Sequence, residues 1–176
     1  MENSETIQVL ASGQFMQMVR HGHWEYARRH NADGAVAILA TTDEGELVLV
    51  EQHRVPMACP CLELPAGLVG DTAADKGEAM RVAAERELLE ETGYTASSIE
   101  HLYPIATSPG LSNEMIDIFR ATGLSKAQDG GGVGHEDITV HLVKVNELDG
   151  WLAKQRSAGM VIDVKVYYAA ALLQRA

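Results

Sequence analysis

The chain has 176 residues, and its 14 Lys and Arg against 25 Asp and Glu give a net charge of −11. This length is typical of one domain with at most a small extension, and a composition of 46% apolar and 22% charged residues is that of a globular protein. Because nucleic-acid affinity depends on clustered Lys and Arg, the charge predicts no nucleic-acid partner. A small anionic ligand, held by metal ions and a few arginines, stays open.

The first part of the chain predicts β-strands. Three stretches with imperfect apolar alternation precede two apolar runs that flank a turn cluster at 41–45, which is the pattern of a hairpin. The expected strands cover residues 6–10, 14–20, 23–29, 34–40 and 46–50.

A helix is expected over residues 76–92, which hold good helix formers, contain no proline and are followed by Gly93 as a C-terminal stop. Later apolar runs predict further strands and two terminal helices with a break at 157–159. These elements are strands 99–106, 115–120 and 138–145 and helices 147–156 and 161–174. Strands, a central helix, more strands and terminal helices together predict an α+β sandwich.

The cysteines and the N-terminus indicate a reducing compartment. Cys59 and Cys61, separated only by Pro60, form neither a disulfide framework nor a complete zinc site, so two reduced packing residues are expected. Residues 1–5 lack the basic-then-apolar pattern of a signal peptide, and no run of about 18 apolar residues predicts a membrane span. We therefore expect a cytoplasmic protein without a membrane partner.

The predicted central helix carries a set of carboxylates. Glu87, Glu90 and Glu91 follow the i, i+3, i+4 spacing and so share one helix face. Hard cations such as Mg²⁺ or Mn²⁺ prefer oxygen ligands of this kind. A solvated acidic face, with Arg86 and Glu90 as an ordinary i,i+4 pair, is the alternative interpretation. The opposite side, including Val82 and Leu88, is expected to pack on a sheet.

The spacing of the fixed residues in this helix resembles the Nudix box, whose pattern here runs from Glu78 to Tyr94. The matching residues are Glu78, Arg86, Glu87, Glu90, Glu91 and Gly93. One position departs from the family pattern, because the box opens with a glycine six residues before its first Glu, where this chain has Thr72. Gly67 precedes Glu78 by eleven residues, which indicates an insertion of about five residues near 70–74.

Further segments resemble the ADP-ribose pyrophosphatase group of this family. Arg54 lies nine residues before the Glu63-Leu64-Pro65-Ala66-Gly67 segment, and Pro109 lies sixteen residues past Gly93, where that group carries a proline. Trp24 and Glu25, followed by Arg29 and Asp33, resemble its adenine and ribose-phosphate contacts. Each residue also has a plainer interpretation: Trp24 as a core or interface residue, Arg54 as a surface ion pair and Pro109 as a turn residue.

The resemblance implies a fold, a reaction and a set of roles. It implies a Nudix-type α/β/α sandwich with a mixed sheet, formed by residues 34–176, and an N-terminal β-strand extension at 1–33 that exchanges between the subunits of a homodimer. It implies hydrolysis of the pyrophosphate bond of ADP-ribose and related nucleoside diphosphate sugars, which yields a nucleoside monophosphate and a sugar phosphate. Two alternatives stay open: another Nudix specificity (nucleoside triphosphates or dinucleoside polyphosphates) and a non-catalytic ADP-ribose-binding module.

The same resemblance assigns the residues. Mg²⁺, with Mn²⁺ as a second option, would be held by Glu87, Glu91 and the Ala66 carbonyl, with Glu90 assisting, to neutralise the diphosphate and activate water. Catalytic or supporting roles fall to Glu90 and to Glu78 and Arg86, which orient the helix. The residues expected at the substrate are Trp24, Glu25, Arg29, Asp33, Arg54, Glu63 and Pro109.

A general base is expected on a loop. Residues 128–134 carry four glycines in seven positions, which predicts a mobile loop, and His135, Glu136 and Asp137 follow it. Glu136 matches the loop glutamate of the ADP-ribose pyrophosphatase group and is the expected base. His135 has the more convenient unperturbed pKa, and three solvated loop residues are the plainer alternative.

Overall fold

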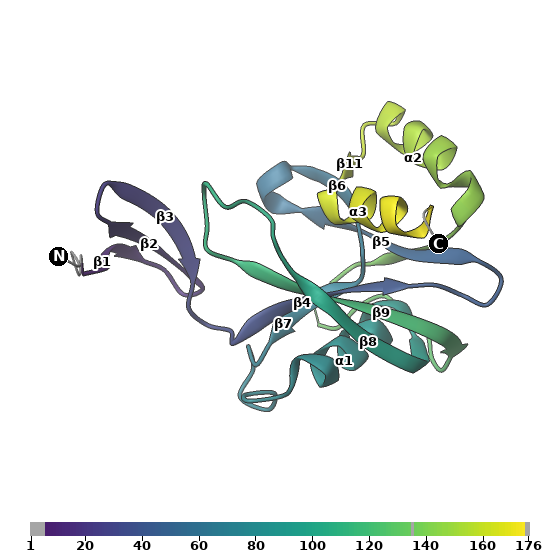
Figure 1. Ribbon diagram of the computed structural model, residues 1–176, viewed down its shortest axis with the longest axis horizontal. Coiled ribbons are helices and arrows are strands. Elements are labelled where there is room, and N and C mark those ends of the chain that lie inside the picture. Colours follow the sequence, from purple (N-terminus) through teal and green to yellow (C-terminus); the bar gives the residue numbers. More distant parts are fainter. Residues whose placement is uncertain (1–5, 135, 175–176) are drawn as a thin grey trace.

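The N-terminal strands form a small sheet of their own. The computed structural model describes residues 6–134 and 136–174. Strands β1 (Gln8–Ser12), β2 (Met16–His21) and β3 (Trp24–Arg29) pair antiparallel in that order. This sheet projects away from the rest of the chain (Figure 1). It is attached through β3, where the Ala27 N–H donates to the Leu111 carbonyl at 2.8 Å.

Two four-stranded sheets form the centre of the body. One has the order β7-β4-β9-β8 and the other the order β10-β5-β6-β11. The strands are β4 (Gly34–Ala40), β5 (Glu46–Arg54), β6 (Cys59–Glu63), β7 (Ala66–Val69), β8 (Tyr94–Ala106), β9 (Met115–Lys126), β10 (Thr139–Lys144) and β11 (Val161–Ile162). The β4–β9 and β6–β11 pairs are parallel and the others antiparallel, so both sheets are mixed.

Helices cover both sides of these sheets (Figure 1). They are α1 (Met80–Thr92), α2 (Leu148–Ser157) and α3 (Val164–Leu173), with 3₁₀ turns at Val55–Met57 and Val145–Glu147. Strand β4 contributes to two separate cores through its alternating side chains: Leu39 faces the core that contains α2 and α3, and Ile38 the core that contains α1. The predicted α+β sandwich is therefore confirmed. None of the helices in the described ranges has the length and apolar character needed to cross a membrane.

Several predicted elements need correction. Residues 34–40 and 46–54 are strands, but β4 and β5 lie in different sheets and pair only at the isolated Thr41–Leu47 bridge, so the predicted hairpin is wrong. Strands β6, β7 and β11 were not predicted, because they are short and Pro60 and Pro65 interrupt the local pattern. Helix α1 begins at Met80 rather than at residue 76, after a loop in which Gly77 has a φ of +80°. The last helix begins at Val164 rather than at residue 161, because Val161 and Ile162 pair with β6.

The packing face of α1 also differs from the prediction. Val82 is 50% exposed, whereas Ala83, Ala84 and Leu88 are fully buried against the sheet. Small residues therefore let this helix approach the sheet closely. The predicted stop at Gly93 is confirmed: its φ is +74°, and its N–H donates to the Leu89 carbonyl at 2.8 Å.

Candidate active site

A pocket of about 450 Å³ lies where α1, β5, β6, β7 and the start of α3 meet. We call it the carboxylate pocket. Six acidic and three basic side chains line it, so its lining has an excess of negative charge. These side chains are Glu63, Asp71, Glu87, Glu91, Glu114, Glu136, Arg29, Arg54 and Lys165.

Helix α1 contributes Glu87 and Glu91 to this pocket, and the backbone of β7 lies against both carboxylates. The Ala66 N–H donates to Glu91 Oε2 at 2.9 Å, so the strand fixes one carboxylate. A Cβ placed on Gly67 would lie 2.0 Å from Cδ of Glu87. Only glycine therefore leaves room for the Glu87 carboxylate at this position.

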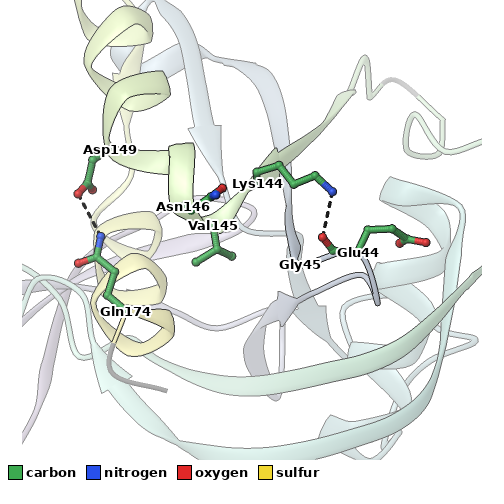
Figure 2. Close-up of a pocket in the computed structure, with 7 residues that line it drawn as sticks. All are labelled: Glu44, Gly45, Lys144, Val145, Asn146, Asp149 and Gln174. Atoms are coloured by element: carbon green, nitrogen blue, oxygen red, sulfur yellow. Dashed lines mark hydrogen bonds between the residues drawn. The ribbon is translucent and has the colours of Figure 1, made fainter.

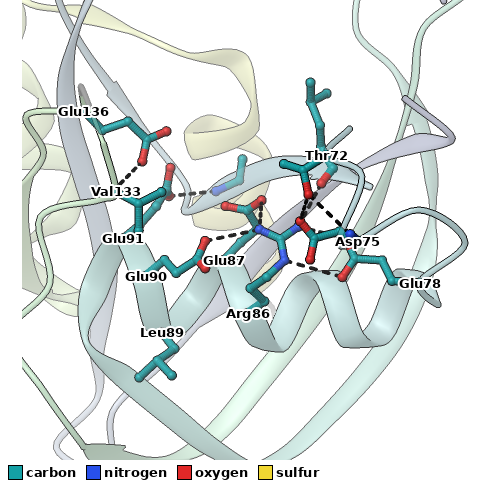
Figure 3. A network of polar contacts seen from close by, with 12 residues as sticks. Thr72, Asp75, Glu78, Arg86, Glu87, Leu89, Glu90, Glu91, Val133 and Glu136 are labelled. Carbon is teal, nitrogen blue, oxygen red and sulfur yellow. Dashed lines mark hydrogen bonds and ion pairs between the residues drawn. The ribbon is translucent and has the colours of Figure 1, made fainter. Parts of the chain in front are cut away.

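Arg86 joins the other carboxylates of the helix (Figure 3). Its Nη1 donates to Glu87 Oε1 at 2.8 Å and to Glu90 Oε2 at 3.1 Å. Its Nη2 donates to Glu78 Oε1 at 2.8 Å and to the Leu68 carbonyl at 3.0 Å. One guanidinium thus connects α1, the loop before it and β7, which is the geometry expected of a positioning residue.

The pKa values of two pocket carboxyls are raised. Burial is the main cause for both, and it raises the pKa of Glu87 to about 7 and that of Glu91 to about 8. Arg86 opposes the shift at Glu87, and the Ala66 N–H opposes it at Glu91. Glu136 lines the same pocket, and its negative charge raises both pKa values further.

The donor set fits a hard divalent cation. Glu87, Glu91 and Glu136 line one pocket, and a cation bound there would offset the desolvation that raises the pKa values of Glu87 and Glu91. Within the described ranges, however, no three His, Cys, Asp or Glu side chains already converge as a ligand group. Arg86 occupies oxygens of Glu87 and Glu90, and Glu91 binds the Ala66 N–H. The Ala66 carbonyl as a metal ligand stays a prediction.

The glycine-rich loop brings Glu136 to the pocket. The N–H groups of Gly131 and Gly132 donate to the carbonyls of Glu91 and Glu90 at 2.9 and 3.0 Å, anchors that the sequence did not predict. Glu136 Oε2 accepts the Val133 N–H at 2.8 Å (Figure 3). A Cβ on Gly132, whose φ is +83°, would lie 2.5 Å from Glu136 Cβ. His135 lies outside the described residues, and both Glu136 and Asp137 are exposed.

Two arginines of the pocket are paired with acids. Arg54 donates two hydrogen bonds, of 2.5 and 2.9 Å, to the buried carboxylate of Glu63. Arg29 bonds Glu114 at 2.9 Å, which links the N-terminal sheet to the body. Each pair holds a planar cation at the pocket wall, a geometry suited to an anionic ligand.

A second hollow of about 470 Å³ contains Trp24, Pro109 and Met115. We call it the Trp24 hollow. Trp24 is 56% exposed, which excludes a core position in this chain. Glu114 lines both this hollow and the carboxylate pocket, so the two are neighbours.

Glu25 and Asp33 lie apart from these two hollows. Glu25 pairs with Arg20 at 2.5 Å, and successive strand residues point to opposite faces, so it does not accompany Trp24. Asp33 lines a smaller adjacent hollow of about 230 Å³ together with Arg29. Their predicted contacts with substrate stay predictions.

A further hollow, of about 540 Å³, shares no lining residue with the carboxylate pocket (Figure 2). In it, Lys144 Nζ donates to the Glu44 carbonyl at 2.9 Å and Gln174 Nε2 to Asp149 Oδ2 at 3.1 Å. It lacks the convergent carboxylates and paired arginines of the carboxylate pocket.

No role was predicted from the sequence for four polar residues of the carboxylate pocket: Gln52, Asp71, Glu114 and Lys165. Glu114 ends the segment that carries Pro109, and Gln52 lies two residues before Arg54, so both stand close to residues that the resemblance singled out. Lys165 gives no such signal, because one lysine near an apolar helix is an ordinary surface pattern.

The mixed-sheet sandwich, with its carboxylate-bearing helix held by Arg86 against β7, defines the Nudix class of proteins. The family described as "NUDIX domain" matches residues 31–162. Because this match covers more than half of the chain, the chain belongs to the Nudix family.

Several curated relatives are similar over much of this length. The ADP-ribose pyrophosphatase of Bacillus subtilis is 38% identical over 141 residues, covering 80% of this chain and 72% of that protein. The GDP-mannose pyrophosphatase of Cronobacter sakazakii is 33% identical over 157 residues, covering 85% and 75%. The methanol dehydrogenase activator of Bacillus methanolicus is 45% identical over 112 residues, 64% of this chain but only 57% of that protein.

A solved structure agrees on the fold. The crystal structure of an ADP compounds hydrolase superposes with a TM-score of 0.64 over 84% of this chain and 80% of that chain. At 21% sequence identity, this likeness supports the architecture alone.

Proposed function

We propose that this protein hydrolyses the pyrophosphate bond of ADP-ribose and related nucleoside diphosphate sugars, which yields a nucleoside monophosphate and a sugar phosphate. One observation carries the proposal: Glu87, Glu91 and Glu136 face the same pocket as Arg29 and Arg54. Carboxylates for a divalent cation and planar cations for a diphosphate are the two elements this reaction needs. The names of the pyrophosphatase relatives support the substrate class.

In this proposal the residues of the pocket have separate roles. Arg29 and Arg54 bind the diphosphate oxygens, and their acidic partners hold them in place. Glu87 and Glu91 would be the principal ligands of an Mg²⁺ or Mn²⁺ ion, which would supply positive charge to offset the repulsion between the diphosphate and the attacking water. Glu136 accepts the proton of that water. Arg86 and Glu78 keep the carboxylate face in position.

The nucleoside is assigned to the Trp24 hollow. The ring of Trp24 is exposed there, beside Pro109, and can stack on a base. Glu114 lines both this hollow and the carboxylate pocket. A ligand with a flat base at one end and a diphosphate in its middle matches this pair of neighbouring hollows.

We further propose a cytoplasmic homodimer with exchanged N-terminal sheets, in which the contacts that Trp24 and Arg29 make with the body of one chain form between the two subunits. The N-terminal sheet and the residues next to its strands expose large apolar side chains: Ile7, Val9, Phe15, Met16 and Met18 are between 41% and 52% exposed. A three-stranded sheet with such a face gains stability when a second surface covers it. Light scattering on a size-exclusion column measures the predicted dimer mass.

The proposed reaction is tested by incubating the purified protein with ADP-ribose and Mg²⁺ and separating the products by chromatography. We expect AMP and ribose 5-phosphate in equal amounts, loss of turnover on chelation, and loss with Glu91→Gln. Preferred cleavage of nucleoside triphosphates or dinucleoside polyphosphates would instead indicate another specificity. Tight ADP-ribose binding without products from the parent protein would indicate a binding module.

A further inference from the structure

Lys165 is a buried cation that the reaction scheme above leaves without a role. It is the second residue of α3, is only 5% exposed and lines the carboxylate pocket. Buried charged residues are rare in proteins unless they are paired or functional. Glu63 and Glu91 are buried in the same pocket, so Lys165 belongs to a group of interior charges around one hollow.

The local structure fixes Lys165 at this place. Asp163 is the N-cap of α3 and accepts the Lys165 N–H through Oδ1 at 2.7 Å. The other Asp163 oxygen accepts Nζ at 2.8 Å. The Asp163 N–H in turn donates to the Leu62 carbonyl at 2.9 Å, which attaches the start of the helix to β6 beside Glu63.

The ammonium has capacity for further bonds. Lys carries three N–H donors, and among the described residues Asp163 is the acceptor that the structure gives to Nζ. The guanidinium of Arg54 likewise has donors beyond the two bonds that it makes to Glu63. An oxygen-rich ligand entering the pocket therefore meets in Lys165 a cation that can form additional hydrogen bonds.

The position of Lys165 indicates which part of a ligand it meets. The Trp24 hollow and the carboxylate pocket share Glu114, which precedes β9, whereas Lys165 lies beside β6 in the other four-stranded sheet. In the proposed binding mode, the nucleoside lies at Trp24 and the diphosphate at Arg29 and Arg54. The sugar-phosphate half of the substrate then lies in the part of the pocket near Lys165.

We propose that Lys165 binds the sugar-phosphate half of the substrate through Nζ and so determines the affinity for that half. This inference rests on the proposed function for the identity of the two halves. The ligand class is a phosphorylated sugar, whose hydroxyl and phosphate oxygens accept hydrogen bonds from an ammonium. Charge-assisted bonds of this kind contribute about 1.5–3 kcal/mol, or about 10- to 150-fold in affinity.

The test titrates the full chain with each product half separately, by calorimetry in Mg²⁺. The probes are AMP for one half and ribose 5-phosphate, glucose 1-phosphate and mannose 1-phosphate for the other. Lys165→Met should raise the Kd of the best sugar phosphate by about 10-fold or more and leave the Kd of AMP within about two-fold. Lys165→Arg should retain part of the affinity.

Two further variants separate binding from folding. Lys144→Met makes the same chemical change in the hollow of Figure 2 and should alter neither Kd. If Lys165→Met does not fold, the double change Asp163→Asn with Lys165→Met removes both charges and keeps an N-cap oxygen for α3. That double variant then provides the same comparison.

The outcomes are distinct. Equal weakening of AMP and sugar phosphate, unchanged affinities, or a parent protein that binds none of the three sugar phosphates would overturn the role of Lys165. Failure of the parent protein to hydrolyse any nucleoside diphosphate sugar would overturn the proposed function, while the titrations would still decide whether Lys165 binds sugar phosphates.

Discussion

The backbone of Gly67 lies directly against the carboxylate of Glu87, and a Cβ at Gly67 would come 2.0 Å from both Cδ and Oε1 of Glu87. Contacts this short do not occur, so any side chain at this position displaces the carboxylate. The approach of β7 to α1 therefore determines where Glu87 points.

Gly67→Ala should therefore reduce kcat by about 10²-fold, because a displacement of about 1 Å at a reacting site has that effect. The fold should remain, since Glu87 can swing toward solvent. Gly150→Ala is the matched control: a Cβ there meets nothing within 4 Å, and alanine favours helix α2. Steady-state kinetics and thermal melts of both variants make the comparison. Unchanged turnover with Gly67→Ala would remove Glu87 from the proposed metal site.

Glu136→Gln should lower kcat by about 10²–10⁴-fold, the range for loss of a general base, with little change in KM. Glutamine keeps an oxygen that can accept the Val133 N–H, so the loop hydrogen bond is retained. His135→Ala should remain within a few-fold of the parent. If His135→Ala is the inactive variant and Glu136→Gln is not, the base has been assigned to the wrong residue.

Trp24→Ala should act through KM, because stacking on a base is present in both the ground state and the transition state. Base–aromatic stacking contributes about 1–3 kcal/mol, which corresponds to about 5- to 150-fold in KM. The melting temperature should change little, since more than half of the side chain is exposed. A large drop in melting temperature with unchanged KM would show that Trp24 is a packing or interface residue.

The stability of the metal-free protein should fall as the pH rises from about 5 to above 8. Glu87 and Glu91 have folded-state pKa values of about 7 and about 8, against 4.5 for the unfolded chain. Between these values the folded state binds more protons than the unfolded state, so each carboxyl lowers the unfolding free energy by at most about 1.4 kcal/mol per pH unit. Thermal melts in a chelator across this range measure the slope.

Two comparisons identify the carboxyls responsible for this pH dependence. Glu91→Gln removes one titrating group and should flatten the slope, while its buried amide keeps the shape of the side chain. Mg²⁺ displaces the protons when it binds and should therefore stabilise the parent more at pH 8 than at pH 6. A melting temperature that rises steadily with pH in the chelator would contradict the raised pKa values.

The identity of the carboxylate helix could be predicted from the sequence. Helical spacing is local, so Glu87, Glu90 and Glu91 had to share a face once residues 80–92 became helical, and Gly93 marked the end. The α+β layering followed from the order of apolar runs. The short strands β6, β7 and β11 could not be predicted in this way, because pairing with other strands stabilises them. The start of α1 gave no local signal either, since no side chain caps it.

Only the tertiary structure decided how the helix is completed as a site. Three segments far apart in the chain complete the site. Strand β7 accommodates Glu87 at Gly67, and the glycine-rich loop brings Glu136 to the pocket that contains Glu91. The start of α3 brings Lys165 to the same pocket as Glu63. Local sequence patterns determine whether a segment favours a helix or a strand and which of its faces is polar. The contacts between segments depend on packing across the whole fold, and a single sequence does not display them. Lys165 illustrates this: it is unremarkable in the sequence, and its burial in the carboxylate pocket follows from the pairing of β11 with β6.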